Sequence, residues 1–266
     1  MTTHLVIPDT QAKPGVPTAH LDWIGRYIVD RKPDVVVHLG DHWDMPSLSS
    51  YDRKGGTRLE GTRVVADIAA GNEAFGILCA PLEEYNATRR EHKERQYLPR
   101  RVLLRGNHEH RITRAVENDA QLEGLLSLDM LASPGWEVIP YLVPLEIDGI
   151  VFSHFFANPM NGRPMGGTAL ARLKNLGHSF VQGHQQIYEQ AIRYVRGKQQ
   201  RALIAGACYL HEEDYLGHPD AHAYWRGVLV LHEVEAGAYN LMEVSLDYLC
   251  RKYEGVSLDE WKAANP

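Results

Sequence analysis

Short apolar runs recur along the chain, and their spacing predicts alternating strands and helices. The runs are rich in β-branched and aromatic residues, and they cover residues 5–7, 35–39, 102–104, 150–152, 180–181, 203–204 and 227–231. Short, continuous apolar runs are typical of strands that are buried on both faces, as in proteins with parallel sheets. The pattern therefore predicts an α/β fold.

The segment between the first two apolar runs has a helical pattern. Leu21, Ile24 and Ile28 recur at helical spacing, Thr18 precedes them as a candidate N-cap, and Pro33 follows them as a stop. A strand, a helix and a strand in this order imply a right-handed crossover and parallel pairing of the two strands. We therefore expect a helix from Thr18 to Lys32 that connects two parallel strands.

A longer helical pattern covers about residues 59–96, which we interpret as a helical insertion in a single domain that spans residues 1–266. Pro81 falls inside this pattern and is expected to break or kink the helix. The charged residues 89–95 are either a solvated helix face or a surface that steers phosphate groups.

Two further segments have simpler patterns. Residues 158–167 contain two prolines and three glycines, so we expect a loop there. Beyond Gly227 the chain alternates between apolar runs and turn residues, and this pattern favours a second, more antiparallel sheet.

Composition narrows the class of protein. With 266 residues, of which 44% are hydrophobic, the chain can bury a sizeable core. No run of apolar residues is long enough to predict a membrane span, and no signal peptide is evident. The three cysteines are widely spaced, which indicates reduced thiols and a cytoplasmic location. The net charge of −6 provides no overall field that attracts nucleic acid.

Polar residues with metal-binding side chains follow five of the predicted strands. In a parallel sheet the carboxyl ends of the strands share one edge, which is where α/β folds place their binding sites. We therefore expect these side chains to meet at one edge of a sheet. They are Asp9, then Asp41 and Asp44 in GDHWD, Asn107 and His108 in GNHE, His154, and His184 in GHQQ.

This ordered set resembles the calcineurin-like metallophosphoesterases. The pattern of that family is Asp-x-His, Gly-Asp-x-x-Asp, Gly-Asn-His-Asp/Glu, a single histidine, and Gly-His-x-His. The matching motifs extend over residues 9–186, which is most of the chain. The resemblance implies a four-layer α/β/β/α sandwich, with mixed sheets flanked by helices and a site for two metal ions on the loops at the strand ends.

Hydrolysis of a phosphate ester explains these residue types. Two divalent ions about 3.5–4 Å apart neutralise the phosphoryl charge and make water nucleophilic near neutral pH. The resemblance implies that Asp41 bridges the two ions. It also assigns one ion, here called the second site, to Asp41, Asn107, His154 and His184. Mn²⁺ is the expected ion, and Mg²⁺, Fe and Zn²⁺ are alternatives.

The same resemblance assigns His108 a role other than metal binding. His108 would protonate the leaving-group oxygen as a general acid, while Asp44 holds its ring and raises its pKa. Glu109 would support the site from behind, whereas His110 is interpreted as incidental.

The family pattern is broken at the other ion, here called the first site. Its ligands should be Asp9, Asp41 and two histidines, but Gln11 and Gln186 stand at the histidine positions. One interpretation is a weak site with oxygen ligands alone, Asp9, Asp41 and the two glutamine carbonyls, which would prefer Mn²⁺ or Mg²⁺. The other interpretation is an empty first site, with one metal ion sufficient for activity.

We predict substrate contacts at two further positions. His42 lies between the two carboxylates of GDHWD and either lines the mouth of the site or packs beside it. Arg163, on the glycine- and proline-rich loop, either binds a phosphate or is solvated. A second histidine cluster is either a third metal site or a loop at the rim, and it contains His211, His218 and His222 with Glu212, Glu213 and Asp214.

The residues after the second motif bear on the substrate. Serine/threonine phosphatases of this family continue Gly-Asp-x-x-Asp with Arg-Gly, whereas Met45 and Pro46 follow Asp44 here. The resemblance therefore favours a phosphodiesterase that uses metal-activated water and His108 to cleave a nucleotide or nucleic-acid diester. The net charge of −6 disfavours the nuclease version. The alternatives are a phosphomonoesterase and a non-catalytic metal-binding scaffold of the same fold.

Overall fold

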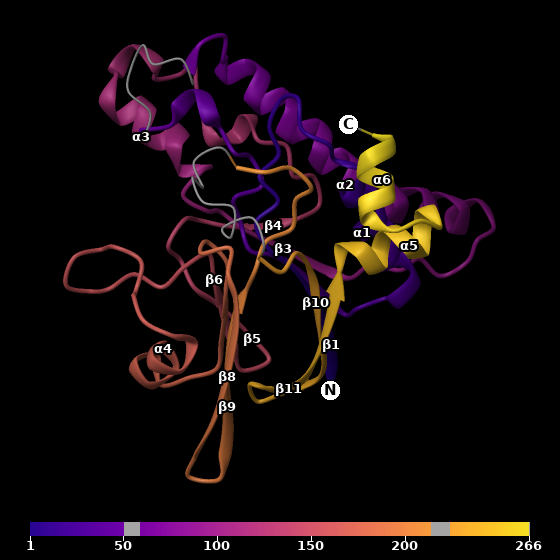
Figure 1. Ribbon diagram of the computed structural model, residues 1–266, viewed down its shortest axis with the longest axis vertical. Coiled ribbons are helices and arrows are strands. Elements are labelled where there is room, and N and C mark those ends of the chain that lie inside the picture. The colour runs from indigo at the N-terminus through magenta and orange to yellow at the C-terminus, as the bar shows by residue number, and fades with distance from the viewer. Residues whose placement is uncertain (51–58, 214–223, 266) are drawn as a thin grey trace.

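The computed structural model describes residues 1–50, 59–213 and 224–265, and it forms two mixed β-sheets with helices outside them (Figure 1). The first sheet has the strand order β11-β10-β1-β2-β3-β4. β1 to β4 are parallel, whereas β10 is antiparallel to both β1 and β11. The strands of this sheet are β1 (Thr2–Ile7), β2 (Val35–His38), β3 (Arg100–Leu104), β4 (Glu137–Ile139), β10 (Gly227–Glu235) and β11 (Ala238–Ser245).

The second sheet has the strand order β5-β6-β7-β9-β8. Its inner strands β6, β7 and β9 are parallel, and the outer strands β5 and β8 are antiparallel to their neighbours. The strands are β5 (Leu145–Ile147), β6 (Ile150–Ser153), β7 (Phe180–Gln182), β8 (Tyr188–Val195) and β9 (Lys198–Ala205).

Helices lie outside both sheets. In Figure 1, α1 and α5 stand beside the first sheet, and α4 stands beside the second. The α-helices are α1 (Ala19–Arg31), α2 (Val64–Glu91), α3 (His110–Asn118), α4 (Ala169–Leu176), α5 (Leu246–Glu254) and α6 (Leu258–Ala264). Short 3-10 helices are η1 (Pro46–Leu48), η3 (Ala120–Leu122) and η4 (Leu128–Met130).

Strand alternation distributes the apolar side chains among three buried clusters. In β1, Leu5 and Ile7 pack with residues of α1, α2 and α5, whereas Val6 packs with residues of the second sheet. In β7, Val181 belongs to the cluster between the sheets and Phe180 to a cluster with α4. Because successive side chains point to opposite faces, a run that is apolar throughout can supply two layers. This arrangement confirms the expectation of an α/β fold.

Helix α1 matches the expected range, but its first turn differs from the prediction. Thr18 is the N-cap residue, yet its side chain makes no capping hydrogen bond, so the expected side-chain cap is wrong. At the other end Lys32 adopts a left-handed conformation with φ of 50°, and its N–H donates to the carbonyl of Ile28. Pro33 follows directly, so the helix ends where the sequence predicts.

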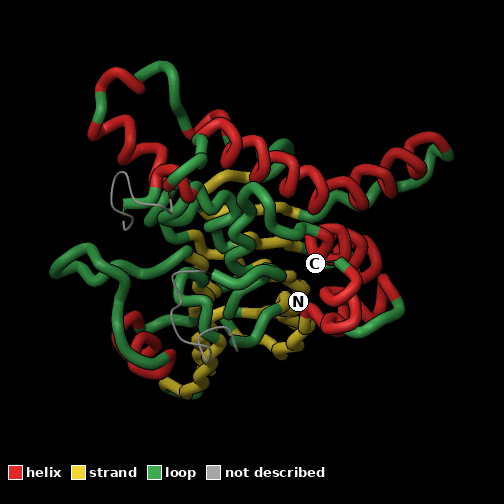
Figure 2. Tube along the Cα trace, turned by 45° about the horizontal axis from the view of Figure 1, so that its top comes forward, coloured by secondary structure: helices red, strands yellow, loops and turns green. Residues whose placement is uncertain are grey.

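Helix α2 runs without interruption through Pro81, so of the two expected effects a break is wrong and a kink stays a prediction. The contact with α1 supplies a physical reason. A Cβ on Gly25 would lie 2.5 Å from the carbonyl oxygen of Leu78 and 2.8 Å from Cγ of Pro81. The two helices therefore pack against each other at a glycine, and this packing offsets the backbone hydrogen bond that proline cannot make. Figure 2 shows α2 as the long helix that crosses the upper part of the molecule.

Helix α2 also changes one expectation about composition. By length and composition alone it is apolar enough to cross a membrane, which the sequence patterns did not predict. Its residues Phe75 and Leu78, however, are buried in the cluster formed with the first sheet and α1. A core helix of a soluble protein passes the same test, so this finding is weak evidence for a membrane span.

The C-terminal region differs from the expected second, antiparallel sheet. β10 and β11 pair with each other and extend the first sheet beyond β1. The antiparallel pattern after Gly227 was interpreted correctly, but its partner was not, because an apolar strand face does not reveal which sheet it joins. The chain then ends in α5 and α6 rather than in further strands.

Candidate metal centre

The polar residues at the strand ends meet between the two sheets. β1, β2 and β3 belong to the first sheet and β6 and β7 to the second, so the expectation of a single sheet edge is wrong. The two edges are joined directly. The backbone N–H of His184, after β7, donates to both carboxylate oxygens of Asp9, after β1, at 3.1 Å. The residues nevertheless converge because the facing sheets place their carboxyl ends together.

The side chains of the predicted second site lie within ligand distance of one another. Oδ1 of Asn107 is 2.9 Å from Nε2 of His154 and 2.7 Å from Nδ1 of His184. Oδ2 of Asp41 is 3.3 Å from Nε2 of His154. Two ligands at right angles around one transition-metal ion, each at about 2.1 Å, lie about 3 Å apart. The donor set and its spacing therefore fit a divalent ion such as Mn²⁺, Fe or Zn²⁺.

The ring orientation of His154 is fixed from behind the cluster. Its Nδ1 donates to the backbone carbonyl of Leu39 at 2.8 Å, and the whole residue is 2% exposed. Because Nδ1 holds the proton in the neutral ring, Nε2 is the nitrogen that faces Asp41 and Asn107. Histidines that bind metals commonly donate their other ring nitrogen to such a partner. The geometry thus suits metal binding through Nε2.

Two glycines allow the carboxylates to approach. A Cβ on Gly106 would lie 2.1 Å from Oδ1 of Asp41, and a Cβ on Gly183 would lie 2.4 Å from Oδ1 of Asp9. Any larger residue would displace a carboxylate from the cluster. The first residues of the Gly-Asn-His and Gly-His motifs are therefore required by space.

Several residues of the cluster adopt a left-handed backbone that is unusual outside glycine. Their φ angles are 42° at Gln11, 49° at Asp41, 68° at His184 and 59° at Gln186. Such conformations cost free energy and tend to gather at functional sites. Here they mark sharp turns of the backbone shortly after the strands, and at Asp41 and His184 these turns accompany side chains that lie in the cluster.

Glu109 supports the loop after β2 from inside the protein. Its carboxylate is fully buried and accepts backbone N–H groups of Asp41, His42, Trp43 and Gly106, at 2.6–3.1 Å. One carboxylate thus holds the segment that carries Asp41 against the segment that carries Asn107. This position agrees with the expectation that Glu109 supports the site.

His108 lies beside the cluster and is bonded to Asp44. Its Nδ1 is 2.7 Å from Oδ1 of Asp44, and its backbone N–H donates to Asp41. Burial lowers the pKa of His108, but Asp41 and the hydrogen bond to Asp44 outweigh this effect and raise it above the ordinary value. Burial would raise the pKa of Asp44, yet the hydrogen bond from His108 lowers it to about 2. A protonated His108 beside an ionised Asp44 suits a proton donor.

Two cations at this position were not predicted. A guanidinium nitrogen of Arg111 is 3.1 Å from Nε2 of His108, and another donates to the backbone carbonyl of Asp44 at 2.8 Å. Nζ of Lys13 is 3.1 Å from Oδ2 of Asp44 and 2.7 Å from Oε2 of Glu213. Arg111 follows His108 by three residues at the start of a helix, a spacing that could have revealed it. No sequence pattern connects Lys13 with Glu213.

The charges of the cluster are balanced by protons. Burial opposes a charge on His154, but the adjacent Asp41 raises the pKa of His154 to about 9. Burial raises the pKa of Asp9 to about 7. Burial also opposes a charge on Asp41, but His108 and His154 hold the pKa of Asp41 well below its usual range. Near neutral pH a proton on His154 therefore compensates the buried carboxylate where a cation would otherwise do so.

The two glutamines of the predicted first site are in different surroundings. Gln11 is fully buried, and in the part of the chain that the structure describes neither its amide oxygen nor its amide nitrogen has a hydrogen-bond partner. Oε1 of Gln186 accepts a hydrogen bond of 2.7 Å from the hydroxyl of Tyr209. Metal binding by either glutamine stays a prediction, and the difference between them is considered below.

The predicted substrate contact at His42 is not supported. His42 is fully buried, its Nδ1 is 2.7 Å from the hydroxyl of Thr10, and its Nε2 is 3.0 Å from the carbonyl of Gly71. Both ring nitrogens are therefore engaged inside the protein, which favours the packing interpretation, and a substrate contact stays a prediction. The physical reason is that the GDHWD loop turns His42 towards α2 while it turns Asp41 towards the cluster.

Arg163 and the second histidine cluster have different outcomes. Arg163 is exposed on the loop before α4, and its guanidinium bonds to none of the described residues, so phosphate binding stays a prediction. His211 pairs with Glu213 at 2.6 Å, and Glu213 in turn binds Lys13. This contact places the two residues beside Asp44. His218, His222 and Asp214 lie outside the described residues.

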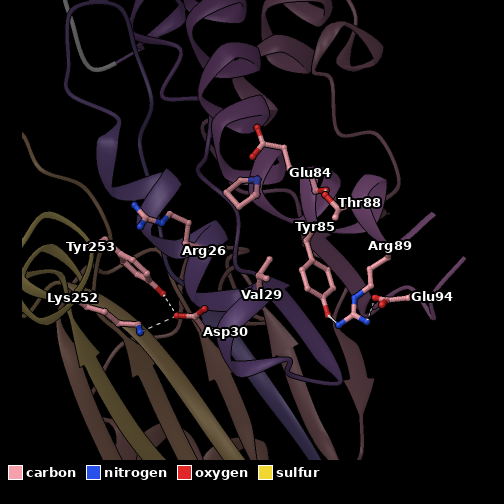
Figure 3. A pocket seen from close by; sticks show the side chains of 11 residues that line it. Arg26, Val29, Asp30, Glu84, Tyr85, Thr88, Arg89, Glu94, Lys252 and Tyr253 are labelled. Atoms are coloured by element: carbon pink, nitrogen blue, oxygen red, sulfur yellow. Dashed lines mark hydrogen bonds and ion pairs between the residues drawn. The ribbon is translucent and has the colours of Figure 1, made fainter. Parts of the chain in front are cut away.

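A separate surface pocket lies between α1, α2 and α5 (Figure 3). Two of its cations pair with its own acids, Lys252 with Asp30 and Arg89 with Glu94, and Arg26 pairs with Asp22. None of the residues of the candidate metal centre lines it. Because Arg89 pairs with Glu94 at this surface, away from the candidate metal centre, the solvated-face interpretation of residues 89–95 is favoured.

The similarity of this chain to known proteins is low. No family model and no curated protein matches the chain. One similar solved structure is a conserved uncharacterized protein from Streptococcus pneumoniae TIGR4, described as a predicted phosphoesterase. The two are 13% identical over 91% of this chain and 98% of that chain, with a TM-score of 0.31. A second crystal structure, whose description names no protein, is 12% identical over 92% and 99% of the two chains, with a TM-score of 0.41. TM-scores this low carry no argument about activity.

Proposed function

We propose that this protein is a metal-dependent phosphoesterase that cleaves phosphodiester bonds of a nucleotide or nucleic acid. The observation that carries this proposal is the convergence of one carboxylate, one amide oxygen and two imidazoles on a single point. The ligand atoms of Asp41, His154 and His184 lie within 4.8 Å of one another, and Asn107 bonds to both imidazoles. The three buried apolar clusters support the four-layer sandwich that we propose for the fold.

The second site would hold the more tightly bound ion, and Mn²⁺ is our first candidate. Its mixed oxygen and imidazole ligands suit first-row transition metals better than Mg²⁺. A divalent ion there would supply positive charge for the phosphoryl oxygens and would lower the pKa of a water molecule. We propose that the first site binds a second ion more weakly, since it lacks imidazole ligands.

His108 would donate the proton to the leaving oxygen. Its Nδ1 donates to Asp44, so Nε2, 3.6 Å from Oδ2 of Asp41, is the nitrogen that would carry the proton for the substrate. When Nε2 is unprotonated, it accepts a hydrogen bond from Arg111. Arg111 stands at the same nitrogen and would supply a second positive group beside the leaving oxygen. A diester has an alkoxide leaving group that needs a proton, so this arrangement favours a diester over a monoester with an acidic leaving group.

The proposal is tested with bis(p-nitrophenyl) phosphate and p-nitrophenyl phosphate, each with added Mn²⁺. We expect turnover of the diester to exceed turnover of the monoester. A p-nitrophenolate leaves with little help, so a dinucleotide is also needed to test the acid. His108→Ala should lower dinucleotide hydrolysis by about 10²–10⁴-fold and hydrolysis of the p-nitrophenyl diester by less.

His110→Ala is the matched control, because His110 is two residues away and its ring stacks on Tyr141 at 4.4 Å. It should leave both activities within about twofold of the native enzyme. A preference for the monoester would indicate a phosphatase. No turnover of either ester at saturating Mn²⁺, with metal bound, would indicate a scaffold and contradict the proposal.

A further inference from the structure

Gln11 presents an unexplained pair of polar atoms inside the protein. It is 0% exposed, and among residues 1–50, 59–213 and 224–265 neither Oε1 nor Nε2 has a hydrogen-bond partner. A buried amide atom without a partner is unfavourable, and a water molecule or an ion at the site is one way to satisfy it. The backbone of Gln11 is fixed beside Asp41, since its N–H donates to the carbonyl oxygen of Asp41 at 2.9 Å.

Gln186 stands at the other altered position but is held by protein contacts. Its Oε1 accepts the hydroxyl proton of Tyr209 at 2.7 Å, and Tyr209 is 2% exposed. The guanidinium of Arg226 lies 4.3 Å from the centre of the Tyr209 ring and donates to its backbone carbonyl at 3.1 Å. The carbonyl of Gln186 is therefore stabilised by a rigid, buried donor, and no ion is needed to explain its position.

We propose that Gln11, and not Gln186, completes the first site, as the third oxygen ligand of a weakly bound divalent ion beside Asp9 and Asp41. This inference rests on the proposed function, because it shares Asp41 with the second site. The carbonyl oxygen of Gln11 binds the ion, and its amide N–H groups then face a water molecule or a phosphoryl oxygen. Both orphaned atoms gain partners in this arrangement.

The consequence is a difference in ion preference between the two sites. The second site offers two imidazoles, which suit Zn²⁺ and Fe as well as Mn²⁺, whereas the first site offers oxygen atoms alone. Oxygen ligands favour hard ions such as Mn²⁺ and Mg²⁺. The protein should therefore hold Zn²⁺ at the second site while Mn²⁺ or Mg²⁺ exchanges at the first.

The test is a titration of the protein with Mn²⁺. Calorimetry measures the affinity and stoichiometry, and electron paramagnetic resonance measures the coupling between the ions. Two Mn²⁺ ions that share Asp41 give a spin-coupled spectrum, which does not depend on activity. We compare the native protein with Gln11→Met, Gln186→Met and Gln11→Glu. The two methionine variants are matched, since each replaces an amide by an apolar chain of similar length.

We expect the native protein to bind a tight and a weak equivalent of Mn²⁺, with a coupled spectrum at saturation. Gln11→Met should weaken binding of the weak equivalent, at the first site, by about 10–100-fold. It should also abolish the spin-coupled signal at intermediate Mn²⁺ concentrations. Gln186→Met should change that affinity by less than about threefold, and Gln11→Glu should tighten it. With Zn²⁺ in the second site, added Mn²⁺ should still bind one equivalent.

Other outcomes overturn the inference. The inference fails if Gln186→Met weakens the weak equivalent, at the first site, as much as Gln11→Met does. It also fails if the native protein never binds more than one ion. In both cases the tight equivalent and the diesterase activity would remain, so the proposed phosphoesterase activity would stand with the second site, although a single ion per chain would remove the weak first site from the proposal. Absence of the tight equivalent itself would contradict the proposed function instead. Thermal unfolding of each variant shows whether the fold is kept.

Discussion

The two halves of the candidate metal centre share Asp41 but differ in how their other ligands are held. At the second site, His154 is oriented by Leu39, and both imidazoles contact Asn107. At the first site, Asp9 is approached by a backbone N–H, and Gln11 has unpartnered amide atoms. Without an ion the second site is compensated by a proton on His154, whereas the first site keeps amide atoms that none of the described residues satisfies.

We infer from this difference that the number of ligands does not by itself determine the affinity of a site for a metal ion. Imidazoles with a fixed orientation require little reorganisation when a cation replaces a proton. The amide oxygen of a buried glutamine is neutral and is a weaker ligand for a metal ion than an imidazole nitrogen. The predictions below either remove this difference between the two sites or enlarge it.

Glu109→Ala should have the largest effect, because it acts on both sites at once. It leaves the buried N–H groups of Asp41, His42, Trp43 and Gly106 without an acceptor. Each orphaned N–H costs about 1–3 kcal/mol, so we expect a loss of more than about 3 kcal/mol in the free energy of unfolding. Chemical denaturation measures this value.

The control is Glu117→Ala, an exposed glutamate on α3, which should change stability by no more than about 0.5 kcal/mol. If the two variants are equally stable, Glu109 does not hold the loops together.

His154→Gln should separate the two sites. It removes an imidazole from the second site, and we expect the tight equivalent of metal to weaken by at least about 100-fold, with a parallel loss of diesterase activity. Isothermal titration with Mn²⁺ measures the affinity. His110→Gln is the same substitution outside the cluster and should leave the titration unchanged. Retention of tight binding in His154→Gln would remove His154 from the ligand set.

Gln11→His combined with Gln186→His should make the two sites alike. Restored imidazoles should tighten the weaker equivalent of metal by about tenfold or more, and they should admit Zn²⁺ to the first site. Competition between Zn²⁺ and Mn²⁺ measures both changes. Unchanged affinity would mean that neither side chain reaches an ion.

The smallest expected effect is a pH dependence of stability in the metal-free protein. His154 has a pKa of about 9 in the folded protein and an ordinary value of 6.5, so the folded state binds more protons between these values. Stability from this group is therefore complete below pH 6.5 and is lost as pH rises towards 9. The raised pKa of Asp9, about 7, acts in the same direction up to that pH.

Thermal unfolding after treatment with a chelator measures this dependence. We expect the midpoint to fall by a few degrees across this range, and added Mn²⁺ should abolish the fall because the ion replaces the proton. His154→Gln should flatten the curve without metal. An unfolding midpoint that rises with pH in the native, metal-free protein would contradict this account.

The apolar runs in the sequence predicted β1, β2, β3, β6, β7, β9 and β10 and the polar residues that follow several of them, but they did not predict β4, β5 or β8. Apolar runs ended in residues such as Asp41, Asn107 and His154, and each lies at the end of a strand in the structure. This success has a local cause, since an apolar run and the polar residue after it are adjacent in the chain. The helix over residues 18–32 was also predictable, because its spacing and its proline stop are local signals.

The positions of the strand ends relative to each other and the contacts of each side chain are visible in the three-dimensional structure alone. The chain places β6 and β7 in a second sheet, continues α2 through Pro81, and turns His42 into the core. Gln11 and Gln186 are both glutamines that follow a strand end, yet the amide of Gln11 has no partner among the described residues and the amide of Gln186 is bonded to Tyr209. Contacts between residues far apart in sequence cause these differences, and a local pattern carries no information about such partners.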